Sequence, residues 1–173
     1  MDRTTRPTRR DRWTRFRFRS VWDLDAPPAR VYAALERPED YPSWWPQIRA
    51  AAPADPGEGR GGSALIRSAL PFTLRVTATE LLRDPDRGIL EVALHGDLEG
   101  WARWTVRPRR GPGARGGGPR TRALYEQEVR VRKPLVRWLA IPGRPLLRLN
   151  HALMMRAGRR GLAARLAAGR EAV

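Results

Sequence analysis

The sequence predicts an α+β fold in which an antiparallel sheet packs against a long C-terminal helix. Three observations predict it. From Phe16 onward, apolar and polar residues alternate within short segments, which is the period of a β-strand. These segments follow one another with turns between them, as in an antiparallel meander and unlike βαβ units. The last third of the chain is helical with one apolar face, and the sheet is the only large apolar surface left to cover that face.

The chain begins with an expected disordered arm and a first strand. Its 173 residues fit one domain. Residues 1–14 are polar and basic without apolar periodicity, so we expect an arm there, a single domain over 15–168 and a short tail over 169–173. The strand's inner face is predicted to hold Phe16, Phe18, Ser20, Trp22 and Leu24.

A helix and an aromatic segment are predicted next. Asp25 is a suitable cap, Pro27 and Pro28 suit a first helical turn, and an apolar stripe from Val31 to Leu35 continues until Pro38. Residues 39–46 are too rich in proline for more than one short helical turn, yet their aromatic side chains must be buried.

Further strands are predicted near 47–53, 62–70, 72–82, 87–95, 98–107 and 121–131. Turns rich in Gly, Asp and Pro separate several of them, because these residues accept the backbone angles of tight reversals. The glycine-rich stretch 109–119 reads as a mobile hairpin loop without a function of its own.

The C-terminal helix is expected to break or kink at 141–145, where two prolines and a glycine stand. At 100° per residue, one apolar sector follows. It comprises Leu146, Leu147, Leu149, Leu153, Met154 and Ala157. Asn150 falls in the middle of this sector, so its side chain is expected to point into the interior.

The charge of +16 is concentrated at the two ends of the chain. Nearly all of it is arginine, Lys133 being the only lysine, which is what a GC-rich coding bias would produce. From Arg132 to Arg170 there are ten basic residues and no acid. The ends therefore form a surface suited to RNA, an anionic membrane or an acidic partner. We favour the plainer interpretation, a solvated face and a disordered arm.

Several classes of site are excluded or disfavoured. Without cysteine there is no disulfide, thiolate metal site or cysteine nucleophile. No nucleophile elbow, phosphate-binding loop or dinucleotide fingerprint occurs, so no cofactor is predicted.

The two histidines are not predicted to form a site. His95 lies beside a Gly-Asp turn and is expected at the surface. His151 lies at the border of the apolar sector and has no partner at metal-ligand spacing. Glu126 and Glu128 are best explained as surface ion-pair partners. No apolar stretch is long enough for a secretory or membrane segment, so a cytoplasmic protein is expected.

Two segments resemble a known superfamily. The stretch Leu24–Leu35 followed by Pro38–Pro46 is similar to the N-terminal signature of the START-like (SRPBCC) superfamily, in its polyketide cyclase/dehydrase and lipid-transport branch. Residues 96–100 and 150–154 resemble further stretches of that branch, and the resemblance covers about residues 16–166. It implies the helix-grip (START/Bet v 1-like) fold: a curved antiparallel sheet of about seven strands around a long C-terminal helix, with two short helices after the first strand.

The resemblance also implies a cavity between the concave sheet and the C-terminal helix. Strand alternation then selects the side chains that face it, and the few polar ones among them are suited to orient an apolar ligand. We predict eight ligand-binding residues and no catalytic residue. They are Trp45, Phe72, Leu74, Trp104, Tyr125, Gln127, Asn150 and Met154.

Three functions follow as hypotheses. The first is binding or carriage of an apolar polyketide, isoprenoid, quinone or lipid in that cavity. The second is an aromatase/cyclase that positions a reactive chain by shape and a few polar groups. The third is a module that docks on RNA, the ribosome or an anionic membrane through its basic ends. The absence of a convincing acid/base pair favours the first, and a titratable group such as His95, Arg67 or Tyr125 inside the cavity would favour the second.

Overall fold

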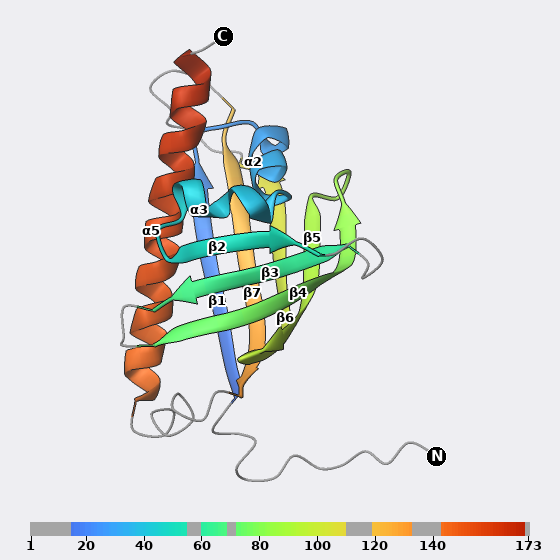
Figure 1. Ribbon diagram of the computed structural model, residues 1–173. Helices are drawn as coiled ribbons and strands as arrows, with labels where there is room; N and C mark the ends of the chain where they lie inside the picture. Colours follow the sequence, from blue (N-terminus) through green and yellow to red (C-terminus); the bar gives the residue numbers. More distant parts are fainter. Residues whose placement is uncertain (1–14, 55–59, 69–71, 110–118, 133–142, 172–173) are drawn as a thin grey trace.

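The computed structural model of the chain (Figure 1) describes residues 15–54, 60–68, 72–109, 119–132 and 143–171. The elements in chain order are β1 (Arg15–Leu24), α2 (Pro28–Leu35), η1 (Pro38–Asp40), α3 (Tyr41–Trp44), β2 (Ile48–Pro53), β3 (Gly61–Arg67), β4 (Thr73–Asp84), β5 (Ile89–Gly96), β6 (Leu98–Pro108), β7 (Thr121–Val131) and α5 (Arg144–Glu171). The predicted arm and most of the glycine-rich stretch lie outside the described residues.

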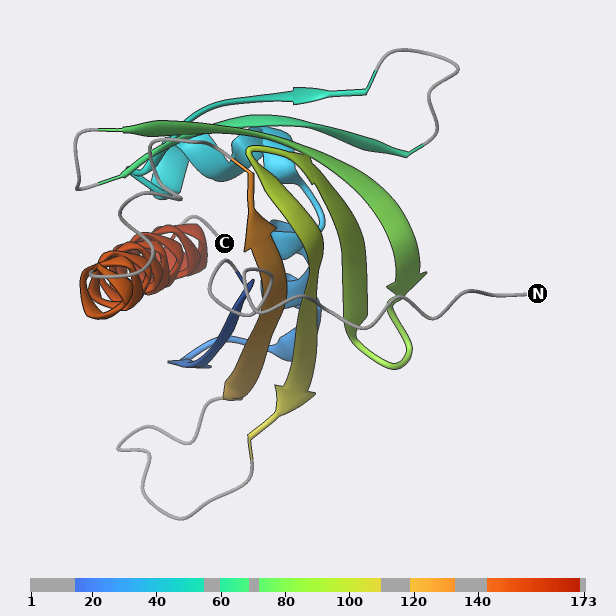
Figure 2. The same ribbon diagram turned by 90° about the horizontal axis from the view of Figure 1, so that it is seen from below.

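One antiparallel sheet contains all seven strands of the described part of the chain, in the order β1-β7-β6-β5-β4-β3-β2. The helix-grip architecture expected from the sequence is therefore correct. Figure 2 shows the sheet curving around, with α5 along the open side of the curve and α2 and α3 inside it. β1 and β2 are at opposite edges of the sheet, so the segment α2-η1-α3 carries the chain from one edge to the other.

Strand alternation determines which side chains reach the concave face. On β1, Phe16, Trp22 and Leu24 are buried, whereas Arg17 and Arg19 are exposed, as the pattern predicts. β7 alternates in the same way, and Phe18 on β1 lies opposite Gln127 on β7. The exposed charges form surface ion pairs, among them Glu128 with Arg15 and Arg17, at 3.1 and 2.8 Å.

Helix α2 begins differently from the prediction. Its N-cap is Pro27, with Pro28 in the first turn and no side-chain cap. Asp25, predicted as the cap, instead pairs with Arg120 at 2.8 Å, because the two residues at the end of β1 and start of β7 lie side by side. The helix keeps its predicted buried stripe, including Val31 and Leu35, and ends before Pro38.

The main difference between the structure and the sequence prediction is the rotation of α5 about its own axis. Leu146, Leu149 and Leu153, predicted to face the sheet, are each about half exposed, at 47%, 54% and 48%. Leu147 is buried as predicted, and the rest of the buried face is formed by Met155, Gly158, Leu162 and Leu166. Met154 and Ala157 are half-buried.

Two glycines explain this rotation. A Cβ on Gly158 would overlap the Trp45 indole, and a Cβ on Gly161 would overlap the backbone of Trp44. The helix therefore approaches α3 through its glycine face, which turns the three leucines outward. α5 also begins at Arg144, inside the predicted break, of which residues 141–142 lie outside the described residues. It continues to Glu171, so residues 169–171 prolong the helix rather than form a tail.

Candidate functional site

Two adjoining cavities lie between the concave sheet and α5. The smaller one, the inner chamber, has a volume of about 160 Å³ and lies between β1, β7, β4 and the first half of α5. The larger one, the outer chamber, has a volume of about 710 Å³ and extends toward α2, η1, β2 and β3. Five residues line both: Ile66, Val76, Leu94, Tyr125 and Met154.

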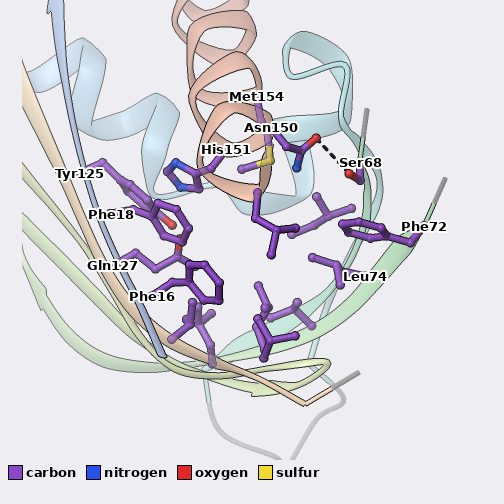
Figure 3. A pocket seen from close by; sticks show the side chains of 17 residues that line it. Phe16, Phe18, Ser68, Phe72, Leu74, Tyr125, Gln127, Asn150, His151 and Met154 are labelled. Carbon is purple, nitrogen blue, oxygen red and sulfur yellow. Dashed lines mark hydrogen bonds between the residues drawn. The ribbon is translucent and has the colours of Figure 1, made fainter. Parts of the chain in front are cut away.

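The inner chamber has an almost entirely apolar wall. Phe16 and Phe18 from β1 lie across it from Leu74 on β4 and from Phe72, the residue just before that strand, as Figure 3 shows. Their alternation on the strands brings these side chains to the concave face and leaves the charged neighbours outside. Among the described residues that line this chamber, none is charged.

A few polar groups interrupt this wall. Gln127 is 8% exposed and lies on β7. The Ser68 hydroxyl donates a hydrogen bond to Oδ1 of Asn150 at 2.9 Å, joining the end of β3 to α5. Burial raises the pKa of the Tyr125 hydroxyl, so Tyr125 stays protonated at neutral pH. Neutral hydrogen-bonding groups on an apolar wall are what small-molecule sites use to orient a ligand.

His151 is a residue of the inner chamber that sequence reasoning missed. It lines the inner chamber, and its ring stacks on Phe18 with centroids 3.9 Å apart and planes 11° apart. Its ring also lies 6.1 Å from that of Tyr125. Burial lowers the pKa of His151 from 6.5 to about 4, so the imidazole is neutral at pH 7. The sequence signal that could have placed His151 in the cavity is its position on the same side of α5 as Gly158 and Leu162, which face inward.

The outer chamber is lined by aromatic residues inside and charged residues at its margin. Trp45 and Trp104 belong to a ring cluster in which Trp22 contacts both, with centroids 5.3 and 4.7 Å apart. The Trp45 indole N–H donates to the backbone oxygen of Met154 at 3.0 Å, which fixes α3 against α5. Trp44, by contrast, is buried beside Trp45 without lining either chamber.

Charged side chains connect the two sides of the outer chamber at its margin. Arg83 on β4 lies 3.3 Å from Glu36 at the end of α2, and 2.8 Å from Glu80. All three line the chamber. Their exposure makes such pairs weak, so they hold the margin together without closing it rigidly.

All eight predicted ligand-binding residues line one or both chambers. Phe72, Leu74, Gln127 and Asn150 line the inner one, Trp45 and Trp104 the outer one, and Tyr125 and Met154 both. His95 and Arg67 are exposed and line neither, so of the three titratable residues considered for catalysis only Tyr125 is in the cavity. Within the described residues, no cluster of potential metal ligands occurs, and no helix is long and apolar enough to cross a membrane.

A curved antiparallel sheet closed by a long C-terminal helix around an apolar cavity defines the START-like class of hydrophobic ligand-binding folds. The chain belongs to the family described as polyketide cyclase / dehydrase and lipid transport, whose model matches residues 15–167. No curated protein sequence matches it.

Solved structures agree with this class. A START superfamily protein from Mycobacterium smegmatis is 16% identical with a TM-score of 0.65, covering 87% of this chain and 96% of its own. The protein TTHA0849 from Thermus thermophilus is 16% identical with a TM-score of 0.64, covering 87% and 99%. The Zhui aromatase/cyclase from Streptomyces sp. R1128 is 14% identical with a TM-score of 0.58, covering 84% and 95%. At these identities the likeness establishes the fold alone.

Proposed function

We propose that this protein binds and carries an apolar small molecule in the two chambers between its sheet and α5. The observation that carries the proposal is the wall of the inner chamber, which is apolar apart from a few neutral hydrogen-bonding groups. Such a wall stabilises an apolar ligand by removing its surface from water, while the polar groups orient it. The family's description supports a compound of the polyketide or lipid kind.

The test is native mass spectrometry of the freshly purified protein, followed by extraction and identification of the bound compound. The matched variants are Val76→Phe and Val21→Phe. Val76 is 6% exposed and lines both chambers, whereas Val21 is 47% exposed on the opposite face of the sheet. We expect Val76→Phe to lower occupancy by about tenfold or more, because the added ring fills ligand space. Val21→Phe should keep the ligand.

Circular dichroism must show that both variants remain folded. An empty wild-type protein that also takes up none of a panel of quinones, lipids and aromatic polyketides would contradict carriage.

A second candidate function is an aromatase/cyclase in the same cavity. The observation that favours it is the pair of titratable rings, Tyr125 and neutral His151, within the inner chamber. A neutral imidazole is able to accept a proton from a substrate carbon or hydroxyl. Incubation with a linear poly-β-ketone separates the two functions: carriage returns the compound unchanged, whereas cyclisation with aromatisation releases water and lowers its mass.

A further inference from the structure

The inner chamber has the size of one aromatic ring. Its volume of about 160 Å³ is close to that of a dry apolar cavity of about 150 Å³ that holds a benzene molecule. Phe16, Phe18, Phe72 and Tyr125 supply aromatic walls, against which a ring packs edge-to-face or in an offset stack. The rest of a larger ligand would extend past the shared residues into the outer chamber.

One buried nitrogen in this chamber has no protein partner. The Nε2 atom of His151 is inaccessible to solvent and makes no hydrogen bond with the described residues. The nearby amide of Asn150 already accepts a hydrogen bond from Ser68. Buried polar atoms nearly always have a partner, so this nitrogen is suited to a polar group on the ligand.

The absence of charged side chains among the described residues of the chamber restricts which polar group of a ligand can pair with Nε2 of His151. The imidazole is neutral at pH 7, and the described residues lining the chamber include no charged side chain. An ionised carboxylate or phosphate would therefore be buried without a counter-charge, which is strongly unfavourable. A hydroxyl fits best, because it both donates and accepts and can pair with either tautomer of the imidazole.

We propose that the inner chamber binds the hydroxylated aromatic ring of a phenolic ligand, with the ring among the phenylalanines and its hydroxyl hydrogen-bonded to Nε2 of His151. The inference rests on the proposed function and narrows its ligand class. It makes His151 the residue that selects a phenol over the corresponding unsubstituted ring.

The test compares 4-fluorophenol with fluorobenzene by ligand-observed ¹⁹F NMR titration. The two probes share a ring and differ in one hydroxyl. Wild-type protein should bind the phenol about tenfold more tightly, the effect of one well-placed hydrogen bond. In His151→Phe, which keeps an aromatic ring beside Phe18 but removes the nitrogen, the preference should disappear while fluorobenzene still binds. The control His95→Phe changes an exposed histidine and should leave the preference intact.

A second measurement needs no variant. In long-range ¹H–¹⁵N spectra of the wild-type protein, 4-fluorophenol should shift the His151 Nε2 resonance, and fluorobenzene should shift it far less. Equal affinities for the two probes, or an unmoved Nε2 resonance on phenol binding, would overturn the phenol assignment. Carriage itself would still stand if an apolar compound of another class co-purifies and is lost in Val76→Phe. These measurements can therefore refute the phenol assignment without refuting carriage of an apolar ligand.

Discussion

His151 makes the stability of the folded chain depend on pH. Its pKa is lowered from 6.5 to about 4 because burial disfavours the charged form. Above pH 6.5 the imidazole is neutral in both the folded and the unfolded chain, and it contributes no pH dependence. As the pH falls from 6.5 toward 4, the unfolded chain binds a proton that the folded chain does not, so the free energy of unfolding decreases.

The expected loss at this residue is about 2 kcal/mol between pH 7.5 and pH 5, because the slope of about 1.4 kcal/mol per pH unit applies only below pH 6.5. Urea denaturation of wild-type protein and His151→Phe at both pH values measures it. The variant should lose about 2 kcal/mol less than the wild type on acidification. His95→Phe, at the exposed histidine, should behave as the wild type does. Equal pH dependence in wild type and His151→Phe would show that the imidazole is not held neutral.

Among elements, α5 differs most from what its sequence suggests. Hydrophobicity alone selects the sector of Leu146, Leu149 and Leu153, because leucine is the strongest apolar signal on the helix. The rotation is instead fixed by the close approach of Gly158 and Gly161 to α3, which a helical wheel does not reveal. Sequence reasoning therefore found the helix and missed its inward histidine.

The strands were predicted almost completely, for a physical reason. Each has one buried and one solvated face, so alternation marks both its position and its orientation, and Gly, Pro or Asp ends it. Four of the eight predicted ligand-binding residues that line the chambers come from strands: Leu74, Trp104, Tyr125 and Gln127. His151 and Ser68 were missed because they depend on how α5 lies against the end of β3, a contact between distant parts of the chain.

The glycine contacts predict opposite effects for the same substitution at two positions on α5. Gly161→Ala should destabilise the protein by about 1–3 kcal/mol, because the new methyl group meets the backbone of Trp44, which cannot move without shifting α3. Gly169→Ala should be neutral or stabilising by up to about 1 kcal/mol, because its methyl group meets only the movable end of the Arg30 side chain and alanine favours the helix. Thermal unfolding of both variants checks the sign. A stabilised Gly161→Ala would contradict the close approach.

In the whole molecule, the contacts that hold the sheet together join distant parts of the chain. Arg17 on β1 pairs with Glu128 on β7, 111 residues away in sequence. Trp45 donates to Met154, 109 residues away. Such long-range pairing requires large loops to close before stabilising contacts form, which slows folding.

Refolding of the whole chain should therefore occur on the order of milliseconds to seconds rather than microseconds. Stopped-flow tryptophan fluorescence is the suitable probe, because Trp22, Trp45 and Trp104 come from separate segments and meet only in the assembled core. Completion of the fluorescence change within microseconds would mean that these rings cluster before the sheet forms.

The stacking of Phe18 on His151 has a consequence for synthesis of the protein. One ring belongs to the first strand and the other to the last helix, and the inner chamber lies beside their contact. A chain still emerging from the ribosome has Phe18 long before it has His151. The chamber is therefore incomplete on a nascent chain that still lacks α5, and we expect such a chain not to take up the proposed ligand.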